Sequence, residues 1–118
     1  MANAVVHFEI GSADSAKLRS FYTSLFGWQF DTTDPSYGVL DQTDGGIGGG
    51  IMQVREDMPS YVTVYVAVDD LPVTLARVEE LGGARVVGPT PIPPIGEFAM
   101  FQDPEDHLIG LLRLDRAP

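Results

Sequence analysis

The sequence predicts an α+β fold built from two tandem β-α-β-β-β modules, and two observations support this. The segment HFEIGSADSAKLRSFYTSLFGW, beginning at His7, lines up with TVYVAVDDLPVTLARVEELGGA, beginning at Thr63. Their alignment places Asp14 on Asp70, so that a strand and a helix start recur in the same order. Three short segments typical of strands then follow each helix.

The first module is predicted to span residues 1–54. A β-rich run at residues 5–10 predicts its first strand, and Asp14 is a good N-cap for a helix over residues 14–26. Further strands are expected near residues 28–32, 37–41 and 50–54. The helix carries an apolar stripe at helical spacing, and we expect it to pack against the sheet. The stripe consists of Leu18, Phe21, Tyr22, Leu25 and Phe26, and the last four are assigned to this packing.

Residues 55–60 are polar, contain a proline and predict a linker. The second module is predicted to span residues 61–118. A strand over residues 61–68 leads to a helix capped by Asp69 or Asp70 and ended by Gly82 and Gly83, and strands follow near residues 84–87, 97–102 and 108–112. Residues 88–96 hold four prolines and predict a rigid surface loop in the polyproline II conformation.

Composition limits the classes of partner. A chain of 118 residues has the usual size of one domain. Seventeen acidic against seven basic residues give a net charge of -10, which repels phosphate backbones and anionic lipids, so we expect no nucleic acid and no membrane partner. The chain has no cysteine for a disulfide, a thiolate nucleophile or a metal site. It shows no signal-like segment at its start, so a cytoplasmic location is expected.

The motifs FYTSLFGW, VDDLPVTLARVEELGGARV and FQDPEDHLIGL together resemble the vicinal oxygen chelate superfamily. That superfamily includes glyoxalase I, bleomycin-resistance proteins and extradiol dioxygenases, and the opening of the chain looks most like small glyoxalase-like proteins of actinobacterial type. The resemblance covers nearly the whole chain. It implies a cup-shaped open barrel that encloses a ligand cavity, and a homodimer.

The resemblance also implies four metal-ligand positions, typically two histidines, or a histidine and a glutamine, with two glutamates. These positions match His7, Thr63, Gly110, and either Gly49 or Gly50. Only His7 keeps a ligating side chain of the family type. Because tightly bound divalent metals generally need at least three protein ligands, we expect no metal cofactor. A weakly bound divalent metal is the alternative.

The alternation of side chains along strands predicts the polar residues of the cavity. It places Glu9 on the same face as His7, and Tyr65 and Tyr61 on the same face as Thr63. We expect His7, Glu9, Thr63 and Tyr65 to anchor a ligand. The missing side chains at Gly49, Gly50 and Gly110 are expected to leave room for it. A second interpretation is that His7 and Glu9 only bond each other or nearby backbone.

His107 and Trp28 are not among the residues that we expect to anchor a ligand. His107 follows the sequence DPED and is expected in a solvent-facing turn. Trp28 either lines the mouth of the cavity or closes the end of the first helix.

Three functions compete. The favoured one is a small-molecule binding protein that has lost the family metal and serves sequestration, resistance or sensing. The alternatives are a metal-dependent lyase, isomerase or dioxygenase with an atypical site around His7 and Glu9, and a dimeric accessory module with no ligand.

Overall fold

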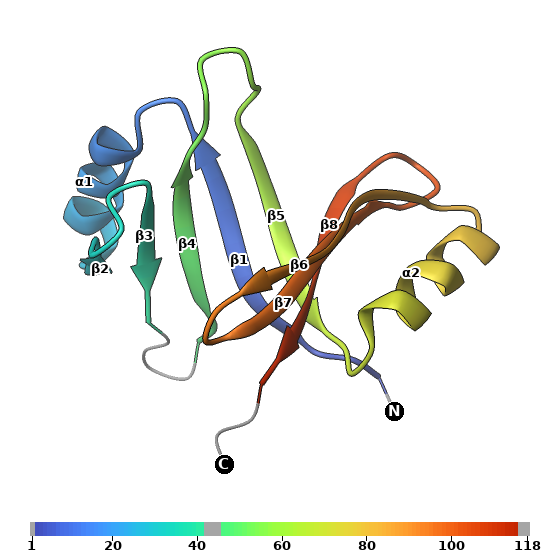
Figure 1. The fold of residues 1–118 in the computed structure, drawn as a ribbon. Coiled ribbons are helices and arrows are strands. Elements are labelled where there is room, and N and C mark those ends of the chain that lie inside the picture. The colour runs from blue at the N-terminus through green and yellow to red at the C-terminus, as the bar shows by residue number, and fades with distance from the viewer. Residues whose placement is uncertain (1, 42–45, 116–118) are drawn as a thin grey trace. The chain divides into compact units, whose positions relative to one another are not determined.

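The computed structural model describes residues 2–41 and 46–115 (Figure 1). Residues 1, 42–45 and 116–118 lie outside this description, and with them the outer ends of the two predicted modules. The chain divides into two compact units. The first unit is His7–Thr63, and the second unit holds the rest of the described chain. Neither helix in the described residues is long and apolar enough to cross a membrane.

The first module has the predicted β-α-β-β-β order. Its hydrogen-bonded strand order is β2-β3-β4-β1, in which β1 runs parallel to β4 and the other pairs are antiparallel. The elements are β1 (Val5–Ser12), α1 (Ser15–Phe26), β2 (Phe30–Asp31), β3 (Tyr37–Leu40) and β4 (Gly48–Gln53). Asp14 caps α1 as predicted, because its side chain accepts a hydrogen bond from the backbone N–H of Lys17.

The second module repeats this topology, with the order β5-β8-β7-β6 and β5 parallel to β8. Its elements are β5 (Tyr61–Ala67), α2 (Leu71–Glu80), β6 (Ala84–Ile92), β7 (Gly96–Gln102) and β8 (Leu108–Leu114). Asp70, not Asp69, is the N-cap of α2. The outermost strands, β2 and β6, each pair on one side only among the described residues, so the sheet is open. The predicted α+β fold of two β-α-β-β-β modules is confirmed.

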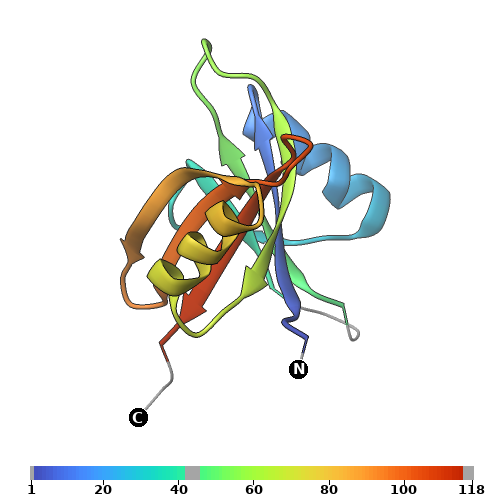
Figure 2. The same ribbon diagram turned by 90° about the vertical axis from the view of Figure 1, so that its right-hand side faces the viewer.

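The second unit contains a conventional apolar core. Helix α2 lies against β6, β7 and β8 (Figure 2) and buries Leu71 and Leu75 completely. They pack with Ala99 of β7 and Leu111 of β8. Burial of this kind contributes roughly 1.5–3 kcal/mol per large aliphatic side chain, which makes this cluster a main source of stability for the second unit.

The prediction that the apolar stripe of the first helix packs against the sheet is wrong for three of its five residues. Phe21, Leu25 and Phe26 are 56%, 57% and 57% exposed, whereas Leu18 and Tyr22 are half-buried. The repeat gives the reason. Where α2 buries Leu71 and Leu75, the alignment puts Ser15 and Arg19 in α1.

These two polar residues lie on the inward face of α1, together with the half-buried Leu18 and Tyr22. Ser15 is buried, and its hydroxyl accepts a hydrogen bond from Arg19 Nη1 at 3.2 Å. The aliphatic stem of Arg19 lies over Gly38 of β3. At the other end of the helix Trp28 packs on the last turn, with its ring centroid 5.1 Å from that of Phe26. Of the two positions considered for Trp28, it takes the one beside the end of the helix.

The proline-rich segment is not entirely a loop, contrary to the prediction. Strand β6 continues to Ile92 and pairs Thr90 with Phe98 of β7. Proline is tolerated here because β6 is an edge strand, so a missing N–H costs no ladder bond on the outer side. Register shifts between Arg85 and Thr90 absorb the irregular backbone.

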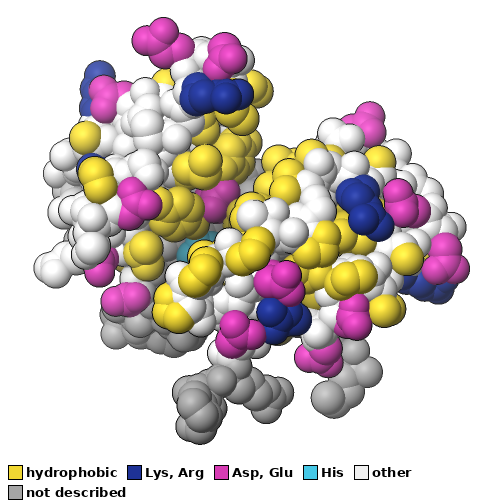
Figure 3. Space-filling view, viewed as in Figure 1, with side chains coloured by type: hydrophobic (Ala, Val, Ile, Leu, Met, Phe, Trp, Pro, Cys, Tyr) yellow, Lys and Arg dark blue, Asp and Glu magenta, His cyan; other side chains and the backbone are white. Residues whose placement is uncertain are grey.

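Acidic side chains are spread over the visible faces of both units instead of gathering in one place (Figure 3). Most of the arginines are paired. Arg113 bonds both Glu97 and Asp115, and Arg85 lies 3.6 Å from Glu79. Such exposed pairs contribute little to stability, because water and salt screen the attraction between the charges.

Candidate functional site

A hydrogen-bonded cluster of four side chains lies on one face of the sheet in the first unit. Tyr37 Oη donates to Glu9 Oε1 at 2.8 Å, and Tyr61 Oη donates to Glu9 Oε2 at 2.6 Å. His7 Nε2 lies 2.9 Å from the same Tyr37 hydroxyl. We call His7, Glu9, Tyr37 and Tyr61 the Glu9 cluster. It joins β1, β3 and the start of β5 through one carboxylate.

Two glycines make this arrangement sterically feasible. Tyr37 starts on β3, and to reach β1 its ring must cross the intervening strand β4. It does so over Gly50, where an added Cβ would overlap the ring. In the same way the ring of Tyr61 lies on Gly11 of β1. Both rings occupy the space of absent side chains and bring their hydroxyls to Glu9.

The direction of the hydrogen bonds follows from counting protons. Tyr37 has one hydroxyl hydrogen and gives it to Glu9, so His7 Nε2 must be the donor to Tyr37. Burial lowers the pKa of His7 below its usual value, although the nearby Glu9 opposes this shift. A neutral imidazole with its proton on Nε2 fits both observations.

Tyr61 is held as a hydrogen-bond donor. Burial raises the pKa of its hydroxyl far above the usual value, and the hydrogen bond and negative charge of Glu9 add to the shift. Glu9 itself is only 5% exposed, whereas His7, Tyr37 and Tyr61 are half-buried. A molecule outside would therefore meet the imidazole and the two phenols before the carboxylate.

The structure brings some of the predicted site residues together. His7 and Glu9 share a face as the alternation predicts, and Thr63 is buried in the same unit. His7 and Glu9 are connected through hydrogen bonds to the hydroxyl of Tyr37, which neither interpretation of these two residues predicted. Tyr65 and Gly110 belong to the second unit, where they are direct partners in the β5 and β8 register.

The expectation that three glycines leave room for a ligand is wrong at those positions. Tyr37 lies over Gly50, Phe8 lies over Gly49, and Tyr65 lies over Gly110, so that an added Cβ would overlap a ring in each case. Aromatic rings of the chain itself therefore fill the space that absent side chains leave.

The implied metal ligands can be tested against this geometry. At the last-strand positions the chain has glycine: Gly110 is covered by Tyr65, and the two candidates in the first module, Gly49 and Gly50, are covered by Phe8 and Tyr37. His7 Nε2 is hydrogen-bonded to the hydroxyl of Tyr37. No three His, Cys, Asp or Glu side chains in the described part of the chain converge on a common point. This donor set does not fit the metal centre that the resemblance implies.

His107 lies in an exposed turn, as predicted, with its side chain 66% exposed. Its Nδ1 is 3.0 Å from Asp103 Oδ2, so it stabilises the turn before β8. Tyr37 is the residue that sequence reasoning missed. The available signal was a tyrosine at the start of one strand and a glycine in the next. Tyr37 and Gly50 are diagonal neighbours in the register of β3 and β4, which the sequence does not show.

Comparison with known proteins identifies the family. Residues 6–112 match the model of the glyoxalase-like domain. The chain is 32% identical to the anthracycline biosynthesis protein DnrV of Streptomyces peucetius over 90% of its own length and 45% of that protein. It is 31% identical to a glyoxylase-like domain-containing protein of Didymella fabae, with 84% of both chains covered. The chain thus spans less than half of the Streptomyces relative.

Solved structures share the fold at low identity. A methylmalonyl-CoA epimerase in complex with methylmalonyl-CoA and ammonium has a TM-score of 0.71 at 15% identity, covering all of both chains. A glyoxalase/bleomycin resistance protein/dioxygenase superfamily member from Vibrio splendidus has a TM-score of 0.66 at 20% identity, covering 95% of this chain and 99% of that one. The repeated modules, the match over most of the chain and these neighbours agree: the chain belongs to the glyoxalase-like domain family of the vicinal oxygen chelate superfamily.

Proposed function

We propose that the protein binds a small organic molecule through the Glu9 cluster, with no metal taking part. The observation that carries this proposal is the position of Tyr37. Its hydroxyl lies between His7 and Glu9, above Gly50, one of the two glycines that match a metal-ligating glutamate position in the resemblance. Phenol and imidazole groups thus stand where the family would present a metal ion.

The chemistry of the cluster suits recognition of a polar group on a ligand. Two tyrosine hydroxyls and an imidazole are half-buried and held in fixed orientations by a buried carboxylate. Groups held in this way lose little conformational freedom when a hydroxyl group of a ligand donates a hydrogen bond to a phenol oxygen. Sequestration, resistance or sensing would each need only such binding.

The class of ligand is suggested by one relative. The Streptomyces peucetius protein, 32% identical, is named for anthracycline biosynthesis. Polycyclic aromatic compounds with carbonyl and hydroxyl groups are therefore the first candidates to test. They would combine apolar area with the polar groups that the cluster can bind.

The test is a thermal-shift screen of such compounds and other antibiotic-like molecules. A ligand at about 100 times its Kd adds about 2.7 kcal/mol to the free energy of unfolding. For a chain of this size that raises Tm by roughly 10 °C or more. The informative variant is Tyr37→Phe, which keeps the ring over Gly50 and removes the hydroxyl.

The matched control is Tyr22→Phe, in the same unit but outside the cluster. We expect Tyr37→Phe to weaken binding of any hit at least tenfold and Tyr22→Phe to leave it unchanged. A panel without hits would count against the proposal. So would a hit that binds both variants as well as the unmodified protein.

A further inference from the structure

The buried carboxylate of Glu9 fixes the direction of both tyrosine hydrogen bonds in the Glu9 cluster. Carboxylate oxygens only accept, so the hydroxyl hydrogens of Tyr37 and Tyr61 both point to Glu9, at 2.8 Å and 2.6 Å. The sulfur of Met52, 3.5 Å from Tyr61 Oη, is the weaker acceptor for the Tyr61 hydrogen. Each phenol therefore uses its one donor inside the cluster. The half-buried Tyr61 can offer a ligand only the lone pairs of its oxygen.

The cluster also carries a negative charge. Burial lowers the pKa of His7 and so favours a neutral imidazole, which leaves Glu9 as the charged member of the cluster. The surrounding unit adds to this charge. Residues 7–63 include eight acidic residues and three basic ones, which are Lys17, Arg19 and Arg55. The field of this unit therefore attracts an organic cation and repels an anion.

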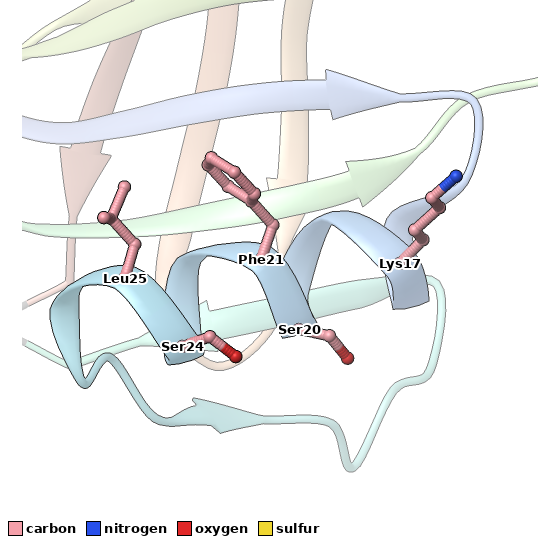
Figure 4. A pocket seen from close by; sticks show the side chains of 5 residues that line it. All are labelled: Lys17, Ser20, Phe21, Ser24 and Leu25. Carbon is pink, nitrogen blue, oxygen red and sulfur yellow. The ribbon is translucent and has the colours of Figure 1, made fainter.

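The three basic residues of the first unit lie away from the cluster. Lys17 is exposed and projects from α1 (Figure 4). The stem of Arg19 lies over Gly38, which follows the cluster tyrosine directly on β3 and so faces the other side of the sheet. Arg55 lies in the exposed turn after β4, 3.5 Å from Asp57. These cations therefore do not compete with a ligand for the cluster.

Exposed apolar side chains adjoin the cluster on its own face of the sheet. Val39 is the direct partner of Gly50, and Met52 is the direct partner of Gly11, so both side chains lie on the face of the cluster. Each of these two side chains is 38% exposed. An aromatic group of a ligand can pack on this surface while a polar group of the same ligand reaches the oxygen of Tyr61.

We propose that Glu9 makes the cluster selective for ligands that carry a protonated amine beside an aromatic group. This inference rests on the proposed function, because it names the class of ligand for the same site. An ammonium N–H donates to the Tyr61 oxygen, and its charge is attracted by the buried Glu9. Hydrogen bonds of charged donors are stronger than those of neutral hydroxyl groups. A carbonyl or carboxylate oxygen would meet another acceptor at Tyr61 and gain no hydrogen bond there.

The first test compares four probes on one naphthalene body. Naphthylethylamine supplies a cationic donor, naphthylethanol a neutral donor, naphthylacetone an acceptor and naphthylacetate an anion. At about pH 7.5 the alkylamine is protonated, and His7, with its lowered pKa, is neutral. Two-dimensional NMR titration of the unmodified protein gives each Kd. We expect naphthylethylamine to bind about tenfold more tightly than naphthylethanol, and the other two probes to bind more weakly than both.

The second test reverses the polarity of the cluster with Glu9→Gln. A carboxamide accepts at its oxygen and donates at its nitrogen, so one of the two tyrosines must turn its hydroxyl hydrogen away from residue 9. Naphthylethylamine should then bind at least about tenfold more weakly, and naphthylacetone more tightly than to the unmodified protein. Glu56→Gln is the matched control, because it removes the same charge from an exposed position of the same unit. It should leave the order of the four probes unchanged.

Three results would overturn the inference. The first is naphthylacetone or naphthylacetate binding to the unmodified protein as tightly as naphthylethylamine. The second is a Glu9→Gln protein that keeps the original order of probes. The third is a series in which no probe binds. The comparison on unmodified protein decides the matter even if Glu9→Gln does not fold. An acceptor-only compound whose binding Tyr37→Phe weakens would sink this inference and still support binding at the cluster, so the two proposals fail separately.

Discussion

The two modules share one topology but use their helices differently. In the second module α2 buries Leu71 and Leu75 against β7 and β8. In the first module the equivalent residues of α1 are Ser15 and Arg19, and three apolar side chains of α1 remain exposed, those of Phe21, Leu25 and Phe26. The same strand and helix order thus supports a closed apolar core in one copy and an exposed apolar surface in the other.

The first and last strands of the two modules differ in a corresponding way. Tyr65 of β5 is the direct partner of Gly110 and covers it with its own ring. The equivalent residue of β1 is Glu9, which is the direct partner of Gly50. There the covering ring comes from Tyr37 of β3 and donates a hydrogen bond to Glu9. A buried carboxylate replaces a packing residue, and its polar partners come from neighbouring strands.

The largest expected effect is a difference in unfolding free energy between matched substitutions in the two helices. Leu75→Ala should lower the free energy of unfolding by about 2–5 kcal/mol, because it opens a cavity in a fully buried cluster. Arg19→Ala, at the equivalent position of α1, should cost less than about 1 kcal/mol. Urea denaturation measures both. Equal losses would mean that α1 is as well packed as α2.

An intermediate effect concerns the glycine beneath Tyr37. Gly50→Ala should cost about 1–3 kcal/mol, because the new methyl group displaces the ring that bonds His7 and Glu9. Gly88→Ala is the control, since an added Cβ there meets nothing within 4 Å. In a Tyr37→Ala background the cost of Gly50→Ala should fall sharply. If the cost is unchanged in that background, the ring is not what the methyl group meets.

The smallest effect is a dependence of stability on pH. Because the folded pKa of His7 is lowered, the unfolded chain binds the extra proton first as pH falls. The stabilising contribution of neutral His7 is complete above about pH 6.5, the unfolded value, and is lost as pH falls toward the folded pKa.

His7→Gln removes this titrating group. The difference in Tm between His7→Gln and the unmodified protein should therefore change between about pH 7 and pH 5, and stay constant above about pH 7.5. His107→Gln, in an exposed turn, is the comparison variant. A pH profile for His7→Gln that parallels the unmodified protein throughout would refute the lowered pKa.

Sequence patterns predicted the topology well, because strand alternation, helix caps and the internal repeat are local signals. Asp14 is recognisable as a cap, the second cap is narrowed to Asp69 or Asp70, and His7 and Glu9 are recognisable as neighbours on one face. Local signals could not show how far Tyr37 reaches, since its partner Glu9 lies two strands away. They also misjudged α1, because helical spacing identifies an apolar stripe without showing whether anything covers it. Only the comparison of Ser15 and Arg19 with the leucines of α2 could have revealed that.

The prolines show that the sequence alone does not reveal which strand lies at the edge of the sheet. Pro89 and Pro91 weigh against a central strand, and the sequence alone does not show that residues 84–92 form an edge strand. Strand order is a property of the folded sheet. A proline destabilises a central strand, where its missing N–H would have paired, and is tolerated in an edge strand such as β6.

The most direct test of the central claim is the metal content of protein purified without chelators, measured together with ligand-induced shifts in Tm before and after chelation. If tyrosine and imidazole groups around Glu9 have taken over from a metal ion, bound metal should be well below one per chain, and chelation should leave both Tm and ligand shift unchanged. One tightly bound divalent metal per chain, lost together with ligand binding on chelation and absent from His7→Gln protein, would contradict the account.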